Sequence, residues 1–258
     1  MSDVSRRQRL LAHPWILGLA GLLIVLLLWS AITATGLVDG LFLPSPAAVF
    51  AAAQAQASTG ILGRDLLASV SRVFSGFALS AAVALPLGIA MGSNRAICQL
   101  LEPLIGLIRY MPAPAFIPLL INYFGLDELP KVMLIFLGTV FFNTLMIMDA
   151  VKFVPHELVE TALTLGGSRA QVLRSVITPC IAPQVLDTYR INMASAWNLV
   201  IVAELVAANE GLGKRISLAQ RFLRTDEIFV GLIVIGLIGL LIDLGFRLLM
   251  RRACAWAH

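Results

Sequence analysis

Apolar runs alternate with short polar stretches along the whole chain. An α-helix rises about 1.5 Å per residue, so a run of about 20 residues crosses the roughly 30 Å of hydrocarbon in a bilayer. Backbone groups must bond internally at that depth, which leaves the helix as the default element. The pattern predicts an all-α polytopic membrane protein with six transmembrane helices, in which residues 1–258 form a single transmembrane domain. The predicted spans cover about residues 15–34, 69–91, 104–121, 131–148, 183–208 and 228–250.

The third predicted span contains three prolines, Pro112, Pro114 and Pro118. Each proline removes a backbone donor and clashes with the preceding helical turn. Lipid-facing helices avoid such breaks, whereas helices that line a cavity tolerate them. We therefore expect this span to be kinked or broken.

The first apolar run fits two interpretations. Basic residues precede it, as they do in a secretory signal peptide. However, the apolar stretch 15–32 is longer than a typical signal core, and residues 31–34 form a poor cleavage site. We favour an uncleaved first helix. The stretch 39–60 predicts an external element in which Pro46 starts a short alanine-rich helix.

Composition supports the membrane assignment. Of the 258 residues, 59% are hydrophobic and 13% are charged. A soluble domain is about 45–50% apolar and about 25% charged, so this chain has too little polar surface for a soluble fold. The cysteines (Cys98, Cys180 and Cys254) are widely spaced and the histidines lack ligand-like spacing, so we expect no disulfide framework and no metal site. The net charge of +4 is related to membrane topology and not to a nucleic-acid partner.

An even number of spans places both termini on one side of the membrane. More lysines and arginines lie on the segments that share this side than on the others, so the positive-inside rule favours cytoplasmic termini. The loop 209–227 departs from this trend, because Lys214, Arg215, Arg221 and Arg224 all lie in it. Its apolar residues follow helical spacing, which fits a helix at the membrane surface or an element that docks or gates against a partner.

A polar segment at 154–180 separates the fourth and fifth spans. Pro155 can begin a helix, and Gly166 with Gly167 can end it, because glycine adopts the left-handed cap without steric cost. Ser168 is a natural N-cap for a second helix over 169–176, which Pro179 would close. Two short helices joined by a glycine elbow suit a groove on a soluble partner. The alternative is a structural hairpin without a partner.

This segment resembles the EAA motif of bacterial ABC-importer permeases. That motif is Glu-Ala-Ala, three residues, Gly, nine residues and then Ile-x-Leu-Pro. The chain departs from it at Thr161, Val176 and Thr178, all of which are small or apolar. The matching residues are Glu160-Thr161-Ala162, Gly166 and Val176-Ile177-Thr178-Pro179.

The resemblance extends over nearly the whole chain and is strongest to permeases for nitrate, sulfonates, taurine and bicarbonate. It implies a type I ABC-importer permease fold in the bacterial inner membrane. It also implies a homodimer with two cytoplasmic ATPase subunits, which bind ATP and Mg, and an external substrate-binding protein. The stretches that support it are 43–46, 69–77, 86–88, 109–112, 124–126, 197, 202–204 and 211–213.

The resemblance further implies which residues couple the chain to the ATPase. Glu160, Ala162 and Gly166 would form the core of a coupling helix that sits in a cleft of that subunit. We assign Thr161, Gly167, Arg169 and Pro179 to the same ATPase-coupling segment. The sequence contains no Gly-x-x-x-x-Gly-Lys-Ser/Thr phosphate loop, so we expect this chain to be no enzyme and to hold no cofactor of its own.

Polar residues inside the predicted spans indicate a translocation pathway. Arg190, Trp197 and Glu204 are seven residues apart and fall nearly on one helix face. Arg190 can pair with Asp187, three residues away, whereas Glu204 needs a partner from another helix. Such a face lines a pathway or serves as polar contact between helices, as we expect for Asn143. The residues that we predict to line the pathway are Arg109, Arg190, Asn192, Trp197, Asn198 and Glu204.

The substrate expected from the resemblance is a small oxyanion or sulfonate, such as nitrate, bicarbonate, taurine or an alkanesulfonate. Arg72 and Arg109 would give an anion a cationic lining, although both could instead reach the membrane interface. The alternative substrate is a vitamin precursor or another heterocycle. A gradient-driven carrier would show inverted repeats with matched broken helices, and a membrane enzyme would show a cluster of catalytic side chains. The sequence shows neither.

Overall fold

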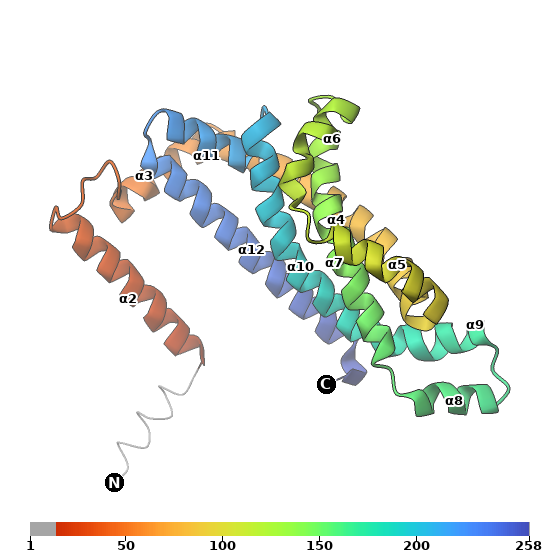
Figure 1. Cartoon of the computed structure of the whole chain (residues 1–258). Coiled ribbons are helices and arrows are strands. Elements are labelled where there is room, and N and C mark those ends of the chain that lie inside the picture. The colour runs from red at the N-terminus through yellow and green to blue at the C-terminus, as the bar shows by residue number, and fades with distance from the viewer. Residues whose placement is uncertain (1–13, 258) are drawn as a thin grey trace, which may run out of the picture. The chain divides into compact units, whose positions relative to one another are not determined.

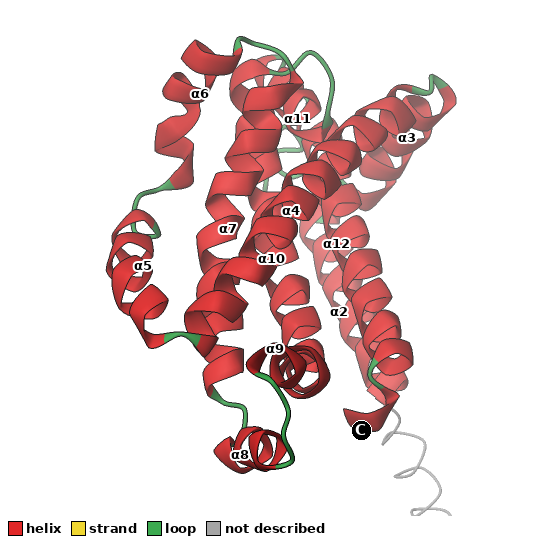
Figure 2. Ribbon diagram, turned by 90° about the vertical axis from the view of Figure 1, so that its right-hand side faces the viewer, coloured by secondary structure: helices red, strands yellow, loops and turns green. Residues whose placement is uncertain are grey.

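The computed structural model describes residues 14–257, and every regular element in that range is helical (Figures 1 and 2). The basic residues Arg6, Arg7 and Arg9 lie outside the described range. The helices are α2 (Pro14–Ala34), α3 (Pro46–Ser58), α4 (Ile61–Ser93), α5 (Arg95–Ile108), η1 (Ala113–Phe116), α6 (Ile117–Phe124), α7 (Glu128–Lys152), α8 (His156–Thr164), α9 (Arg169–Val172), η2 (Leu173–Ile177), α10 (Thr178–Ala207), α11 (Leu212–Arg221), α12 (Thr225–Ala253) and η3 (Ala255–Ala257).

The chain forms two compact units. The first unit comprises Met1–Leu62 and Arg215–Leu232. Within it, the indole Nε1 of Trp29 donates to the carbonyl of Pro44 at 3.0 Å, and the ring stacks on Phe229 with centroids 5.4 Å apart. Ser45 caps α3 by accepting a bond from the backbone of Ala48. The short alanine-rich helix predicted to start at Pro46 is confirmed.

The second unit comprises Gly63–Lys214 and Ile233–His258. In this unit α7 and α10 lie side by side (Figures 1 and 2). A buried polar chain crosses from α10 through α7 to α4, because Asn192 donates to Asn143 at 2.7 Å and Asn143 donates to Ser80 at 3.0 Å. Apolar side chains of the same three helices, including Ala84, Ile147 and Ile181, fill the adjacent core.

Four helices, α2, α4, α7 and α12, are long and apolar enough to cross a membrane, and a fifth crossing is counted if one bent helix pair acts as a single span. The described helices thus support a multi-pass protein, and the number six stays a prediction. The predicted span 183–208 lies within α10 except for its last residue, and Arg190, Asn192 and Glu204 lower the hydropathy there.

The bent pair consists of α5 and the helical residues 113–124, which meet at an angle of 84°. The break at Pro112 confirms the prediction that prolines interrupt the third span. Helix α5 itself begins at Arg95, upstream of the predicted start of the span near residue 104. Asn94 starts the helix there by accepting bonds from the backbone amides of Ala96 and Ile97.

Candidate functional site

The polar segment after α7 folds as two short helices joined by an elbow. Helix α8 follows Pro155, and it carries Glu160, Thr161 and Ala162. The chain then turns at Gly166, whose φ of +86° lies in the left-handed region that glycine adopts without strain. The amide of Gly167 donates back to the carbonyl of Ala162 at 3.0 Å, which closes the end of α8.

Ser168 begins the second helix through a complete capping box. Its hydroxyl accepts from the backbone of Gln171 at 3.3 Å, and the Gln171 side chain accepts from the Ser168 amide at 2.8 Å. These reciprocal bonds satisfy two backbone donors that a helix start leaves unpaired. The N-cap predicted at Ser168 is therefore confirmed.

The prediction that Pro179 closes this second helix was wrong. Helix α9 continues through the π-helical turn η2 directly into α10, and Pro179 stands in the first turn of α10. A proline is tolerated there because the wider π turn changes the bonding pattern, and the Thr178 hydroxyl donates to the Leu173 carbonyl at 2.8 Å. The helix after the elbow is thus continuous with a long helix of the bundle.

Helix α8 has no buried residue, although it packs against α9 and η2. Glu160 and Arg169 are exposed, and so are three leucines, with Leu165 exposed to 84%. Figure 1 shows α8 and α9 together at one end of α7 and α10. An exposed helix with both carboxylate and apolar side chains is a surface that a partner protein could cover. The exposed leucines are Leu158, Leu163 and Leu165.

A cavity of about 600 Å³ lies at the break between α5 and η1. Its walls come from residues 108–116, from α7 and from α10. Aromatic side chains form much of the lining, and Ser195 and Asn198 of α10 add polar groups. Proline-broken backbone beside a cavity agrees with the rule that irregular backbone at membrane depth lies within protein or along a water-filled space.

Arg109 is the cationic residue of this cavity lining. Its Nη2 donates to the hydroxyl of Tyr110 at 3.1 Å, and its guanidinium lies 4.9 Å from the centre of the Tyr110 ring. Its Nε is buried and has no hydrogen-bond partner among the described residues. The guanidinium of Arg109 therefore has N–H donors that no described protein group accepts.

The other residues predicted to line the pathway lie in three different environments. Arg190 bonds to Asp187 at 2.8 Å and to Asp243 of α12 at 2.9 Å, so the predicted local pair is confirmed. Asn192 is buried in the chain that includes Asn143, whose predicted role as a contact between helices is also confirmed. Trp197 is buried, and only Asn198 joins Arg109 in the cavity lining.

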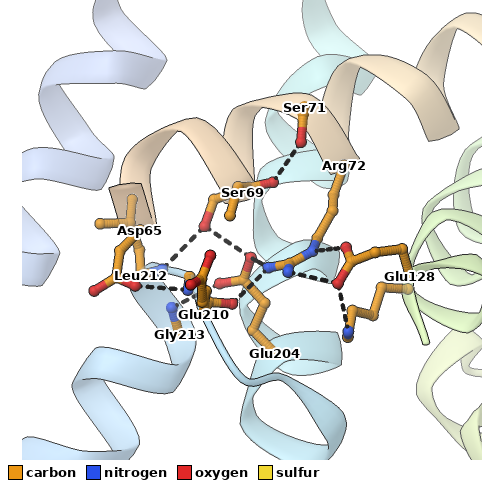
Figure 3. A network of polar contacts seen from close by, with 12 residues as sticks. Asp65, Ser69, Ser71, Arg72, Glu128, Glu204, Glu210, Leu212 and Gly213 are labelled. Atoms are coloured by element: carbon orange, nitrogen blue, oxygen red, sulfur yellow. Dashed lines mark hydrogen bonds and ion pairs between the residues drawn. The ribbon is translucent and has the colours of Figure 1, made fainter. Parts of the chain in front are cut away.

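Glu204 lies near the C-terminal end of α10. It belongs to a buried polar network (Figure 3). It is fully buried, and Arg72 of α4 is only 4% exposed. The Arg72 Nη1 donates to Glu204 at 2.7 Å and to the backbone carbonyl of Glu210 at 2.7 Å. Its Nε and Nη2 bond to Glu128 at the start of α7, and Lys131 also donates to Glu128, at 2.9 Å.

The same network holds the start of α11. The amide of Gly211 donates to Asp65 at 3.0 Å, that of Leu212 to the Ser69 hydroxyl at 2.9 Å, and that of Gly213 to Glu204 at 2.8 Å. Ser69 in turn donates to Glu204 at 2.7 Å. Gly211 has a φ of +130°, and a Cβ at this position would collide with the Glu204 carboxylate.

Asp65, Ser69 and Glu128 were not predicted as site residues from the sequence. A buried glutamate signals that a partner exists, but spacing along the chain does not identify that partner. The structure shows that Glu204 faces this network and does not line the cavity.

Comparison with known proteins agrees with these features. Residues 84–253 match the family model described as binding-protein-dependent transport system inner membrane component. A probable ABC transporter permease protein of Brucella melitensis is 39% identical over 88% of this chain and 92% of its own length. The taurine transport system permease protein TauC of Escherichia coli strain K12 is 34% identical over 95% of this chain and 91% of its own length.

Two further similarities concern substrate and fold. The riboflavin transport system permease protein RibX of Chloroflexus aurantiacus is 33% identical over 99% of this chain and 97% of its own length. A solved structure of the inward-facing MetNI methionine ABC transporter aligns with a TM-score of 0.68 at 17% identity. That alignment covers 75% of this chain and 96% of the MetNI chain.

Proposed function

Because the chain belongs to the family of binding-protein-dependent transport system inner membrane components, we propose that it carries a small oxyanion or sulfonate across the membrane. The chain is the permease of an ABC importer, a non-enzymatic membrane component with the type I importer permease fold. The argument for the substrate class comes from the cavity at Arg109.

The observation that carries this proposal is Arg109 in the cavity. A guanidinium offers two parallel donors that match the oxygens of an oxyanion or a sulfonate, and it stays charged at every physiological pH. Arg109 and Asn198 both line the cavity and supply donors without the tight cage that would hold an ion too strongly. A pathway must bind its substrate weakly enough to release it. TauC, a relative named for taurine transport, agrees with this class.

The test is uptake by the reconstituted complex of permease, ATPase and binding protein. Wild-type chain should transport one of taurine, an alkanesulfonate, nitrate or bicarbonate, and Arg109→Gln should lower that rate about tenfold, the loss expected for one charged hydrogen bond. Arg95→Gln is the matched control, because Arg95 is an exposed arginine at the start of α5, the helix that ends just before Arg109. Equal uptake by wild type and Arg109→Gln would contradict the proposal.

The other candidate substrate is a planar heterocycle. Phe116, Phe141 and Phe142 line the cavity, and aromatic faces can stack on a ring system. The similarity to RibX, which is named for riboflavin transport, favours the same class. Uptake of riboflavin that is unaffected by Arg109→Gln would select this alternative.

We propose the partners from the family. Two copies of this chain would form the pathway, two cytoplasmic ATPase subunits would bind ATP and Mg, and an external binding protein would deliver the substrate. The exposed face of α8 supports its assignment as the helix that enters the ATPase cleft. With this helix and both termini cytoplasmic, the Arg72 network would lie toward the external side of the inner membrane.

A further inference from the structure

The start of α11 is held in place by side chains and not by its own helix. Three consecutive backbone amides, those of Gly211, Leu212 and Gly213, each donate to a side chain of α4 or α10. The first amides of a helix have no partner within that helix and carry its partial positive charge. Here the carboxylates of Asp65 and Glu204 bind two of them, so this end of α11 is fixed to two other helices.

Arg72 connects this anchor to α7. All three of its guanidinium nitrogens are engaged, by Glu204, Glu128 and the Glu210 carbonyl. Arg72 and Glu204 are both buried, so separating them would leave two buried charges without each other, whereas Glu128 is 61% exposed and can be solvated. In this structure all of these contacts are made.

The helix that carries Glu204 also reaches the polar segment. Helix α10 follows η2 and α9 without a loop, and about 26 residues separate Thr178 from Glu204. At about 1.5 Å per residue this distance is about 39 Å, enough to cross the bilayer. Pro183 lies inside α10, and we take the helix to move largely as one body through it, so that a tilt of α9 displaces Glu204 relative to Arg72.

We propose that Arg72 and Glu204 are positioning residues that hold the segment Glu210–Gly213 against α4 and α10 in one transport state and release it in another. Release would free the start of α11 to move when ATP is bound. The inference rests on the role of the chain as the permease of an ABC importer. It does not depend on the substrate.

The first test follows hydrogen exchange in the wild-type complex in nanodiscs. The amides of residues 211–213 should be protected without nucleotide and should exchange about tenfold faster or more in the vanadate-trapped complex with binding protein. Amides in the middle of α10, at 196–200, serve as the internal reference and should not change. Equal protection of 211–213 in both states would overturn the proposal.

The second test uses substitutions in the complete complex. Glu204→Gln keeps the size of the side chain but places an amide where Gly213 needs an acceptor. The stimulation of ATPase by loaded binding protein should fall by between about 5-fold and 150-fold, the usual range of coupling between sites. Arg64→Gln is the matched control, because it breaks the exposed pair with Glu210 in the same region and should retain wild-type stimulation.

The outcomes separate this inference from the general role. Wild-type complex without any stimulated ATPase would contradict the importer assignment itself. Stimulated wild type with equally stimulated Glu204→Gln, at equal assembly, would overturn the positioning role. If Glu204→Gln does not assemble, the exchange measurement on wild type decides alone, because it requires no substitution.

Discussion

Position 166 favours glycine because of its backbone conformation and not because of a lack of space for a side chain. Its φ is +86°, and a Cβ built on it would meet nothing within 4 Å. An L residue in the left-handed region costs about 1–2 kcal/mol, so a side chain at this position acts on the angle between α8 and α9 alone.

Gly166→Ala should therefore weaken the junction by about 1–2 kcal/mol without filling any space. The measured effect should be a lower retention of ATPase subunits when the permease is purified, and Gly166→Asp should lower the retention further. Gly106→Ala is the matched control, because Gly106 also has open space around it but lies within helix α5. Unchanged retention in Gly166→Asp would remove the evidence that this elbow faces the ATPase.

The second residue-scale prediction concerns Asn143, which is fully buried between Ser80 and Asn192. Asn143→Ala leaves both neighbours without their bond, which costs about 1–3 kcal/mol for a buried polar group. The melting temperature of the purified complex should fall, and Ser80→Ala should add little in the Asn143→Ala background. Additive losses in the double variant would show that the two side chains act independently.

At the scale of elements, the junction of α9, η2 and α10 determines how far a movement of α8 travels. The three elements follow each other without a loop from Arg169 to Ala207. A stiff junction passes a tilt on, whereas a flexible one absorbs it. The π turn is thus a place where stiffness can be changed without touching the cavity.

Replacing Ser175 and Val176 in η2 with glycine should uncouple the two ends of this helix. Each glycine costs about 1 kcal/mol within a helix and loosens it, so binding protein should no longer stimulate the ATPase although the complex still assembles. A glycine pair at Ala51 and Gln54 on α3 is the control. Full stimulation with glycines in η2 would show that α10 does not transmit the signal.

The elements themselves were largely predictable from the sequence. Hydropathy placed one long helix at five of the six predicted spans, whereas the span 104–121 crosses the break between α5 and η1. Gly166 and Ser168 marked the elbow correctly, because caps depend on local chemistry. The end assigned to Pro179 failed for a physical reason. Proline disfavours a helix interior but is compatible with a first turn, and nothing in the sequence signalled that a π turn would join the two helices.

At the scale of the whole molecule, an exposed cysteine provides a test of the orientation in the membrane. Cys180 is exposed beside the polar segment, whereas Cys98 and Cys254 are buried. A membrane-impermeant maleimide should therefore label Cys180 in inverted vesicles and not in intact spheroplasts. Cys180→Ser should abolish the signal. Labelling from the outside would reverse the proposed topology and place the Arg72 network on the cytoplasmic side.

The candidate sites differ in how much of them the sequence could reveal. Arg109 and Asn198 were predicted as pathway residues because polar groups are rare at membrane depth, and both line the cavity. The pairing within the Arg72 network was not predictable, because its members come from four segments, although Arg72 and Glu204 each stood out in the sequence as a charge inside a predicted span. Only tertiary packing brings Asp65, Glu128 and Glu204 to the same arginine and helix start.

The separation of these partners along the chain has a consequence for biosynthesis. Arg72 is made early, Glu128 follows 56 residues later and Glu204 follows 132 residues later. At about 5–20 residues per second, a ribosome needs roughly 7–26 s to supply Glu204. During that interval Glu128 is the carboxylate within reach of Arg72, so the nascent α4 would settle first with α7. The packing of α4 against α10 would then follow only after α10 leaves the ribosome.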